Sequence, residues 1–127
     1  MASIEKLPAG AFNISRWSGG TTTELFIWPH GASYAERRFS IRISTATVDI
    51  AESTFTKLPG VTRYIAPLGD GFTLKIGQNE PEFIPHAAVK RFDGGEDVTC
   101  VGAGRDLNLM LSGAAGELIK NLPHMPF

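Results

Sequence analysis

Short segments in which apolar and polar residues alternate are the feature that most constrains the fold of this chain. In residues 39–44 every second side chain is apolar, with Ser40, Arg42 and Ser44 at the positions between. Residues 72–76 alternate in the same way. A period of two is that of a β-strand, whose successive side chains point to opposite faces. The 14 glycines and 8 prolines are scattered between such segments and indicate frequent turns, so we expect an all-β fold.

Eight short strands separated by turns predict a single domain, 1–127, built as an antiparallel β-barrel or jelly roll. The expected strands are residues 11–16, 22–28, 39–44, 62–67, 72–76, 88–92, 97–102 and 106–112. Gly and Asp in residues 69–71 tolerate positive φ, which predicts a tight hairpin between the fourth and fifth of these strands. Residues 114–127 are expected to form a short helix and a tail, because Pro123 and Pro126 prevent a longer helix.

Charge and hydropathy together exclude several classes of partner. Twelve Lys and Arg against 13 Asp and Glu give a net charge of −1, without the basic excess typical of nucleic-acid binding. No segment approaches the roughly 18 apolar residues that cross a bilayer, and residues 1–10 lack the pattern of a secretory signal. We therefore expect a cytoplasmic protein that binds neither nucleic acid nor a membrane.

The candidate metal ligands are few and scattered. His30, His86 and His124 are isolated from one another, and each follows a proline, which is typical of loops rather than of a His-x-His pair on a strand. Cys100 stands between apolar residues and is expected to be a buried, inert thiol. We predict no metal and no other cofactor. The sequence contains no nucleophile elbow and no close Cys/His or Glu/His pair, so no motif indicates a catalytic residue.

Arginines on strand faces are the candidate binding groups. Arg42 shares a strand face with Ser44, Arg63 follows the turn at 58–60, and residues 106–110 alternate polar and apolar side chains. Inside a small β-barrel such arginines would bind a carboxylate through paired N–H donors. The same pattern also describes the solvated outer face of a strand, so both orientations remain open.

Six segments, in order along the chain, resemble motifs of the HutD/Ves family. They are RWSGGTTTEL (16–25), which is similar to W-x-G-G-x-T-x-E-L, FSIRISTA (39–46), FTKLPGVTR (55–63), LGDG (68–71), FDG (92–94) and DLNLM (106–110).

The resemblance implies a cupin-type β-barrel, usually double in the family. It also implies a non-enzymatic, regulatory protein that binds a small acidic metabolite of histidine degradation, similar to formylglutamate. Arg42 and Arg63 would then point inward as carboxylate clamps. The ligand-binding residues that the resemblance implies are Trp17, Thr21, Glu24, Arg42, Ser44, Arg63, Asp106, Asn108 and Met110.

Family members continue well beyond the last of these motifs. This chain has only a short segment after Met110, so we expect a short member that lacks most of the C-terminal region. Because an open β-edge or apolar face favours pairing, such a chain is expected to form a homodimer.

Two other functions stay open at this point. A small cupin enzyme of isomerase or epimerase type, acting on a small carboxylate, would need an acid or base in the cavity, and Glu24, Asp106 and His86 are the candidates. An interaction module without a ligand would have an interior filled with apolar side chains.

Overall fold

The computed structural model describes residues 13–17, 19–29 and 31–113. The predicted helix and tail at 114–127 therefore lie outside the described residues, as do residues 11 and 12 of the first predicted strand. No helix occurs in the described part of the chain, and so none there is long and apolar enough to cross a membrane.

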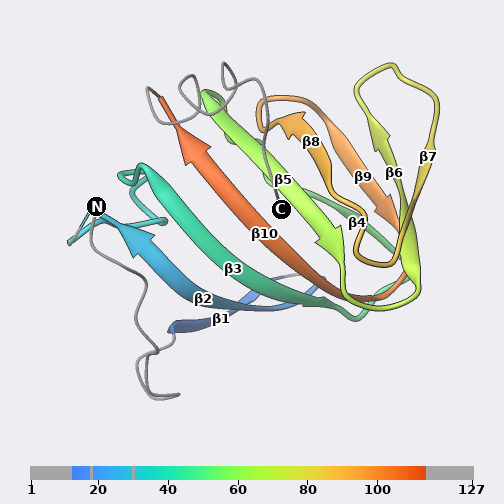
Figure 1. Cartoon of the computed structure of the whole chain (residues 1–127), viewed down its shortest axis with the longest axis horizontal. Coiled ribbons are helices and arrows are strands. Elements are labelled where there is room, and N and C mark those ends of the chain that lie inside the picture. The colour runs from blue at the N-terminus through green and yellow to red at the C-terminus, as the bar shows by residue number, and fades with distance from the viewer. Residues whose placement is uncertain (1–12, 18, 30, 114–127) are drawn as a thin grey trace.

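Ten strands in these residues form two antiparallel sheets. The larger sheet contains, in spatial order, β1 (Asn13–Trp17), β2 (Gly20–Trp28), β3 (Ile41–Val48), β10 (Gly104–Ser112), β5 (Val61–Pro67) and β8 (Lys90–Asp93). The smaller sheet contains β4 (Glu52–Thr54), β9 (Val98–Val101), β6 (Gly71–Ile76) and β7 (Glu82–Pro85). Figure 1 shows the larger sheet as a long curved layer, with the smaller sheet packed against its β5–β8 end.

The all-β prediction and its jelly-roll form are confirmed, whereas a closed barrel is wrong for the described residues. The larger sheet ends at β1 and β8, and the smaller sheet ends at β4 and β7, so neither closes on itself. Each of the eight predicted strands overlaps an observed one, but β4 and β7 were not predicted. Both are short, and neither has a run of alternating residues long enough to indicate a strand.

The predicted hairpin at residues 69–71 is wrong. β5 pairs with β10 and β8, while β6 pairs with β7 and β9, so this turn carries the chain from one sheet to the other. The glycine requirement is nevertheless real, because Gly71 has φ of 110° and a Cβ there would lie 2.6 Å from the Ile84 carbonyl oxygen. Turn residues show that the chain changes direction, but burial decides which strands then pair.

The space between the two sheets contains an apolar core that positions the site. Its largest cluster includes Ile65 of β5, Phe72 and Leu74 of β6, Phe92 of β8 and Cys100 of β9. Cys100 is fully buried, as predicted, and burial raises the pKa of its thiol to about 11, which keeps it protonated and unreactive at neutral pH. The apolar core fills the β6 and β9 end of the space between the sheets.

Candidate functional site

The register of three neighbouring strands brings polar side chains into one inward-facing group. β10 lies between β3 and β5, and Met110 is opposite Arg42 on one side and Arg63 on the other. Two residues further along, Asn108 is opposite Ser44. Because alternate residues of a strand share a face, these side chains point into the same space.

β3 shows which face of the predicted alternating strand is buried. Arg42 and Ser44 are 5% and 1% exposed, whereas Ile41 and Ile43 on the opposite face are only partly buried. The polar face therefore points inward, as the family resemblance implied. A solvated outer face for Arg42 is wrong.

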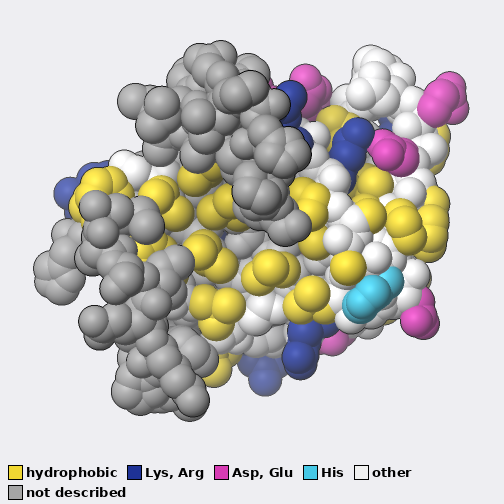
Figure 2. All heavy atoms as spheres, viewed as in Figure 1, with side chains coloured by type: hydrophobic (Ala, Val, Ile, Leu, Met, Phe, Trp, Pro, Cys, Tyr) yellow, Lys and Arg dark blue, Asp and Glu magenta, His cyan; other side chains and the backbone are white. Residues whose placement is uncertain are grey.

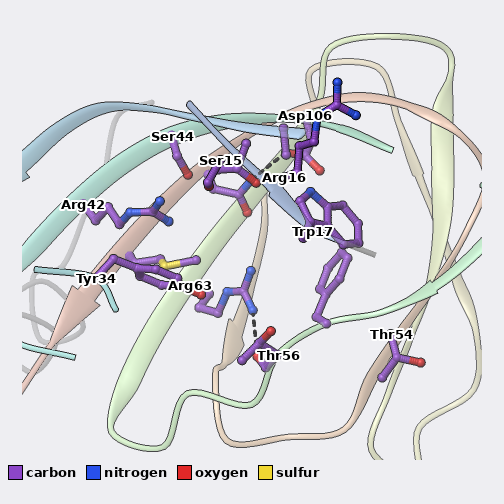
Figure 3. A pocket seen from close by; sticks show the side chains of 15 residues that line it. Ser15, Arg16, Trp17, Tyr34, Arg42, Ser44, Thr54, Thr56, Arg63 and Asp106 are labelled. Atoms are coloured by element: carbon purple, nitrogen blue, oxygen red, sulfur yellow. Dashed lines mark hydrogen bonds between the residues drawn. The ribbon is translucent and has the colours of Figure 1, made fainter. Parts of the chain in front are cut away.

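These residues line a cavity of about 220 Å³. Figure 3 shows Arg42 and Tyr34 on one side of it and Trp17 and Asp106 on the other. The lining side chains come from β1, β2, β3, β4, β5, β10, the loop before β3 and the segment after β4. They are Ser15, Arg16, Trp17, Thr22, Tyr34, Arg42, Ser44, Ala46, Thr54, Phe55, Thr56, Arg63, Asp106, Asn108 and Met110.

Arg42 is buried together with a counterion. Its Nε donates to Glu24 Oε2 at 2.8 Å, and the two side chains are 6% and 14% exposed. Its guanidinium carbon also lies 3.9 Å from the centre of the Tyr34 ring, in cation–π geometry. Glu24 thus neutralises Arg42 from the edge of the site, and only Nε of Arg42 is used in that ion pair.

Arg63 is buried without such a counterion. It is 7% exposed, and no carboxylate of the described residues lies within ion-pair distance of it. Its guanidinium carbon lies 5.3 Å and 5.2 Å from the ring centres of Phe55 and Phe92, and Nη1 donates to the Thr56 carbonyl at 3.4 Å. Arg63 Nε has no hydrogen-bond partner among the described residues. Burial lowers the pKa of Arg63, although Tyr34 and Asp106 oppose that shift.

Asp106 is a buried acid in the same cavity. It is 2% exposed, and its Oδ1 accepts a hydrogen bond of 2.5 Å from Asn108 Nδ2. Burial raises the pKa of Asp106 to about 6, against the opposing effects of Asn108, a backbone hydrogen bond at Ala46 and the charge of Arg63. Asn108 Oδ1 has no partner among the described residues.

The histidines do not contribute to this cavity in the described residues. His86 is exposed, and its Nδ1 lies 2.9 Å from the Gly69 carbonyl oxygen. His30 and His124 lie outside the described residues. No group of three potential metal ligands occurs in residues 13–17, 19–29 and 31–113. The absence of a metal and of any other cofactor stays a prediction.

The structure brings together seven of the nine predicted binding residues. Trp17, Arg42, Ser44, Arg63, Asp106, Asn108 and Met110 line the cavity, whereas Thr21 and Glu24 do not. Glu24 forms an ion pair with Arg42 instead. The backbone N–H of Thr21 lies 3.3 Å from Thr47 Oγ1, and its neighbour Thr22 lines the cavity.

A match to a family model assigns this chain to a protein family. The sequence model of the HutD family matches residues 9–121. The chain belongs to the HutD family. No curated protein matches it.

Solved structures agree with this assignment. The chain is similar to HutD from Pseudomonas fluorescens SBW25, in a structure described as a formate condition, with 26% identity and a TM-score of 0.71 over 82% of this chain and 58% of that one. It is also similar to a conserved protein of unknown function from Pseudomonas aeruginosa PAO1, with 28% identity and a TM-score of 0.69 over 84% and 54% of the two chains. The chain therefore spans a little over half the length of these two proteins.

A more distant structure shows the same fold. An RmlC-like cupin from Shewanella frigidimarina is 9% identical, with a TM-score of 0.63 over 91% of this chain and 96% of that one. At that identity the similarity concerns the fold alone, which is a cupin fold.

The HutD motif could have identified Thr22, rather than Thr21, as the threonine that lines the cavity. In W-x-G-G-x-T-x-E-L the fixed threonine falls on Thr22, and that residue lines the cavity. Thr21, the predicted binding residue, points to the opposite face of β2. Tyr34 and Phe55 are also lining residues that sequence reasoning missed, because both lie outside the strands and no periodic pattern marks them.

Proposed function

We propose that this HutD-family chain binds a small acidic metabolite of histidine degradation, similar to formylglutamate, and acts in a regulatory role without converting it. The proposal rests on the burial of Arg63 without a counterion among the described residues. A buried guanidinium without a counterion is costly, and an anion that enters the cavity would supply the missing charge.

The rest of the cavity suits a small polar acid. Arg42 uses Nε on Glu24, which leaves its two Nη groups for a ligand, and Ser44 adds a neutral hydrogen-bonding group. Trp17 and Met110 supply apolar contact surface. The volume of about 220 Å³ lies below the ~300–1,000 Å³ typical of drug-sized ligands, which favours a metabolite of few heavy atoms.

A thermal unfolding titration tests the proposal. With N-formyl-L-glutamate at about 100 times its Kd, the Tm should rise by roughly 5 °C or more, because ligand binds only the folded chain. Arg63→Gln should abolish the rise, and Arg91→Gln, which changes an exposed arginine of β8, should leave it intact. No shift with any small mono- or dicarboxylate would contradict the proposal.

A small cupin isomerase or epimerase is a second candidate function. Asp106 favours it, because a cavity carboxyl with a pKa of about 6 can exchange a proton with a substrate near neutral pH. Such an enzyme would exchange the α-hydrogen of a bound carboxylic acid with solvent in D₂O, and Asp106→Asn would stop the exchange. Binding without deuterium incorporation would favour the regulatory function.

A further inference from the structure

Asp106 is a buried carboxyl group that no cation of the described residues contacts. It belongs to none of their ion pairs, although it shares a cavity with arginines. Its two cross-strand neighbours are Ala46 on β3 and Pro67 on β5, which offer no side-chain hydrogen bond. The ionised form is therefore poorly stabilised here, and its raised pKa is consistent with this environment.

The charges around Asp106 are mostly positive and lie at a distance. The groups that carry or can acquire charge around it are Arg63 on β5, Arg42 on β3 with its partner Glu24 on β2, Arg16 on β1, Tyr34 in the loop before β3 and the Cys100 thiol on β9. Because Arg42 is already neutralised by Glu24, Arg63 is the buried cation that attracts an anion towards Asp106.

An acid held by Arg63 would place its own negative charge in the same small cavity as Asp106. Two carboxylates in one poorly solvated site repel each other, and one of them takes up a proton in preference. Asn108 Nδ2 donates to Oδ1 of Asp106, and the backbone of Ala46 also hydrogen-bonds to this carboxyl group, so we place that proton on Oδ2.

We propose that Asp106 binds the ligand as a neutral carboxylic acid, donating a hydrogen bond from Oδ2 to an oxygen of the bound acid, and that each ligand bound takes up one proton from solvent. This inference rests on the proposed function. It makes Asp106 a residue that selects acids without a positive charge, and it makes affinity depend on pH. A zwitterionic amino acid would instead place its ammonium group on the ionised form of Asp106.

Isothermal titration calorimetry with N-formyl-L-glutamate measures the number of protons taken up when the ligand binds. Titrations at pH 7.5 in phosphate and in Tris, which differ in ionisation enthalpy, should give an uptake close to one proton per ligand. The Kd should rise about tenfold per pH unit between pH 6.5 and 8, because the carboxylates of the ligand stay ionised throughout and only Asp106 changes state.

Two variants assign the effect to Asp106. In Asp106→Asn the amide donates the hydrogen bond at every pH, so its Kd should change by less than about threefold between pH 6 and 8, with no proton uptake. Asp70→Asn, which changes an exposed carboxylate in the turn before β6, should keep the pH dependence of the natural chain. If Asp106→Asn does not fold, the proton count of the natural chain still decides.

Three results would overturn the inference. Binding of the acid with no proton uptake and a pH-independent Kd would leave the proposed function standing and refute the role of Asp106. Tighter binding of L-glutamate than of its N-formyl derivative, improving as pH rises, would show that Asp106 binds as a carboxylate. Absence of any binding between pH 5.5 and 8 would overturn the proposed function itself.

Discussion

Two arginines of the same cavity differ in what neutralises them, and that difference defines the site at the scale of single residues. Arg42 has Glu24 at 2.8 Å, whereas Arg63 has two aromatic rings and a carbonyl oxygen. Aromatic faces attract a cation only weakly compared with a carboxylate. Of these two buried arginines, Arg42 is paired with a carboxylate, and Arg63 has no carboxylate partner among the described residues.

Glu24→Gln should destabilise the chain without a ligand. It leaves Arg42 buried and unpaired, which typically costs about 3–5 kcal/mol, so urea unfolding should show a loss of that order. Glu36→Gln is the matched control, because the exposed pair of Glu36 with Arg38 contributes about 1 kcal/mol or less. Equal losses in both variants would contradict the buried role of Glu24.

The raised pKa of Asp106 predicts how stability changes with pH in the absence of ligand. The folded chain binds this proton more tightly than the unfolded chain, whose carboxyl has the ordinary pKa of 3.8. The stabilisation is therefore complete below about pH 4 and is lost as pH rises through about 6. A shift of about two pKa units corresponds to at most about 3 kcal/mol.

Urea unfolding at pH 4, 5, 6 and 7 measures this effect by comparing the natural chain with Asp106→Asn. The free energy of unfolding of the natural chain should fall relative to that of the variant as pH rises, with most of the change between pH 4 and 6. A constant difference between the two chains would show that Asp106 has an ordinary pKa in the folded state.

At the scale of elements, the alternation of polar and apolar residues predicted where the strands lie, but it did not predict which strands pair. The pattern in β3 indicated that one face is polar, but it could not say that the polar face points inward, because that depends on what β10 and β5 place beside it. Arg42, Met110 and Arg63 lie opposite one another on three neighbouring strands, although they are distant in sequence. The family motifs, which join those segments, allowed seven of the 15 lining residues to be predicted.

The turn between β1 and β2 depends on a glycine that touches the neighbouring strand. A Cβ at Gly20 would lie 1.8 Å from the backbone oxygen of Thr47, so Gly20→Ala must displace β2 from β3. Overpacking of this kind typically costs about 1–3 kcal/mol. Thermal unfolding should show the loss, together with weaker ligand binding, because β1 carries Trp17 into the cavity.

Gly69→Ala serves as the comparison for this variant. No atom lies within 4 Å of a Cβ built there, and the backbone of Gly69 does not have positive φ. Its unfolding temperature should match that of the natural chain to within a degree or two. A similar loss at both glycines would mean that close packing at Gly20 is unimportant.

At the scale of the whole molecule, the outer face of the larger sheet carries exposed apolar side chains. Figure 2 shows hydrophobic side chains spread over β3, β10 and β5, and Leu107 on β10 is 40% exposed. Ile41 and Ile43 point to the same face. Exposed apolar sheet faces are typical interaction surfaces, so we propose that two copies of the chain pair through this face.

Light scattering coupled to gel filtration tests the pairing. The natural chain should have twice the mass of one chain, 13.7 kDa, and Leu107→Lys should shift it towards the mass of a monomer. Glu52→Gln, which changes an exposed residue of β4 in the smaller sheet, should not change the mass. A monomer for the natural chain at micromolar concentration would contradict the proposed homodimer.

We propose that the cavity between Arg42 and Arg63 binds a small acid. A crystal structure of the chain grown at pH 6 with N-formyl-L-glutamate tests it most directly. We predict density for the acid in this cavity, with a carboxylate oxygen within hydrogen-bonding distance of the Arg63 guanidinium and another oxygen beside Asp106. A cavity that stays without the acid at saturating concentration, or an acid bound elsewhere on the chain, would contradict the account.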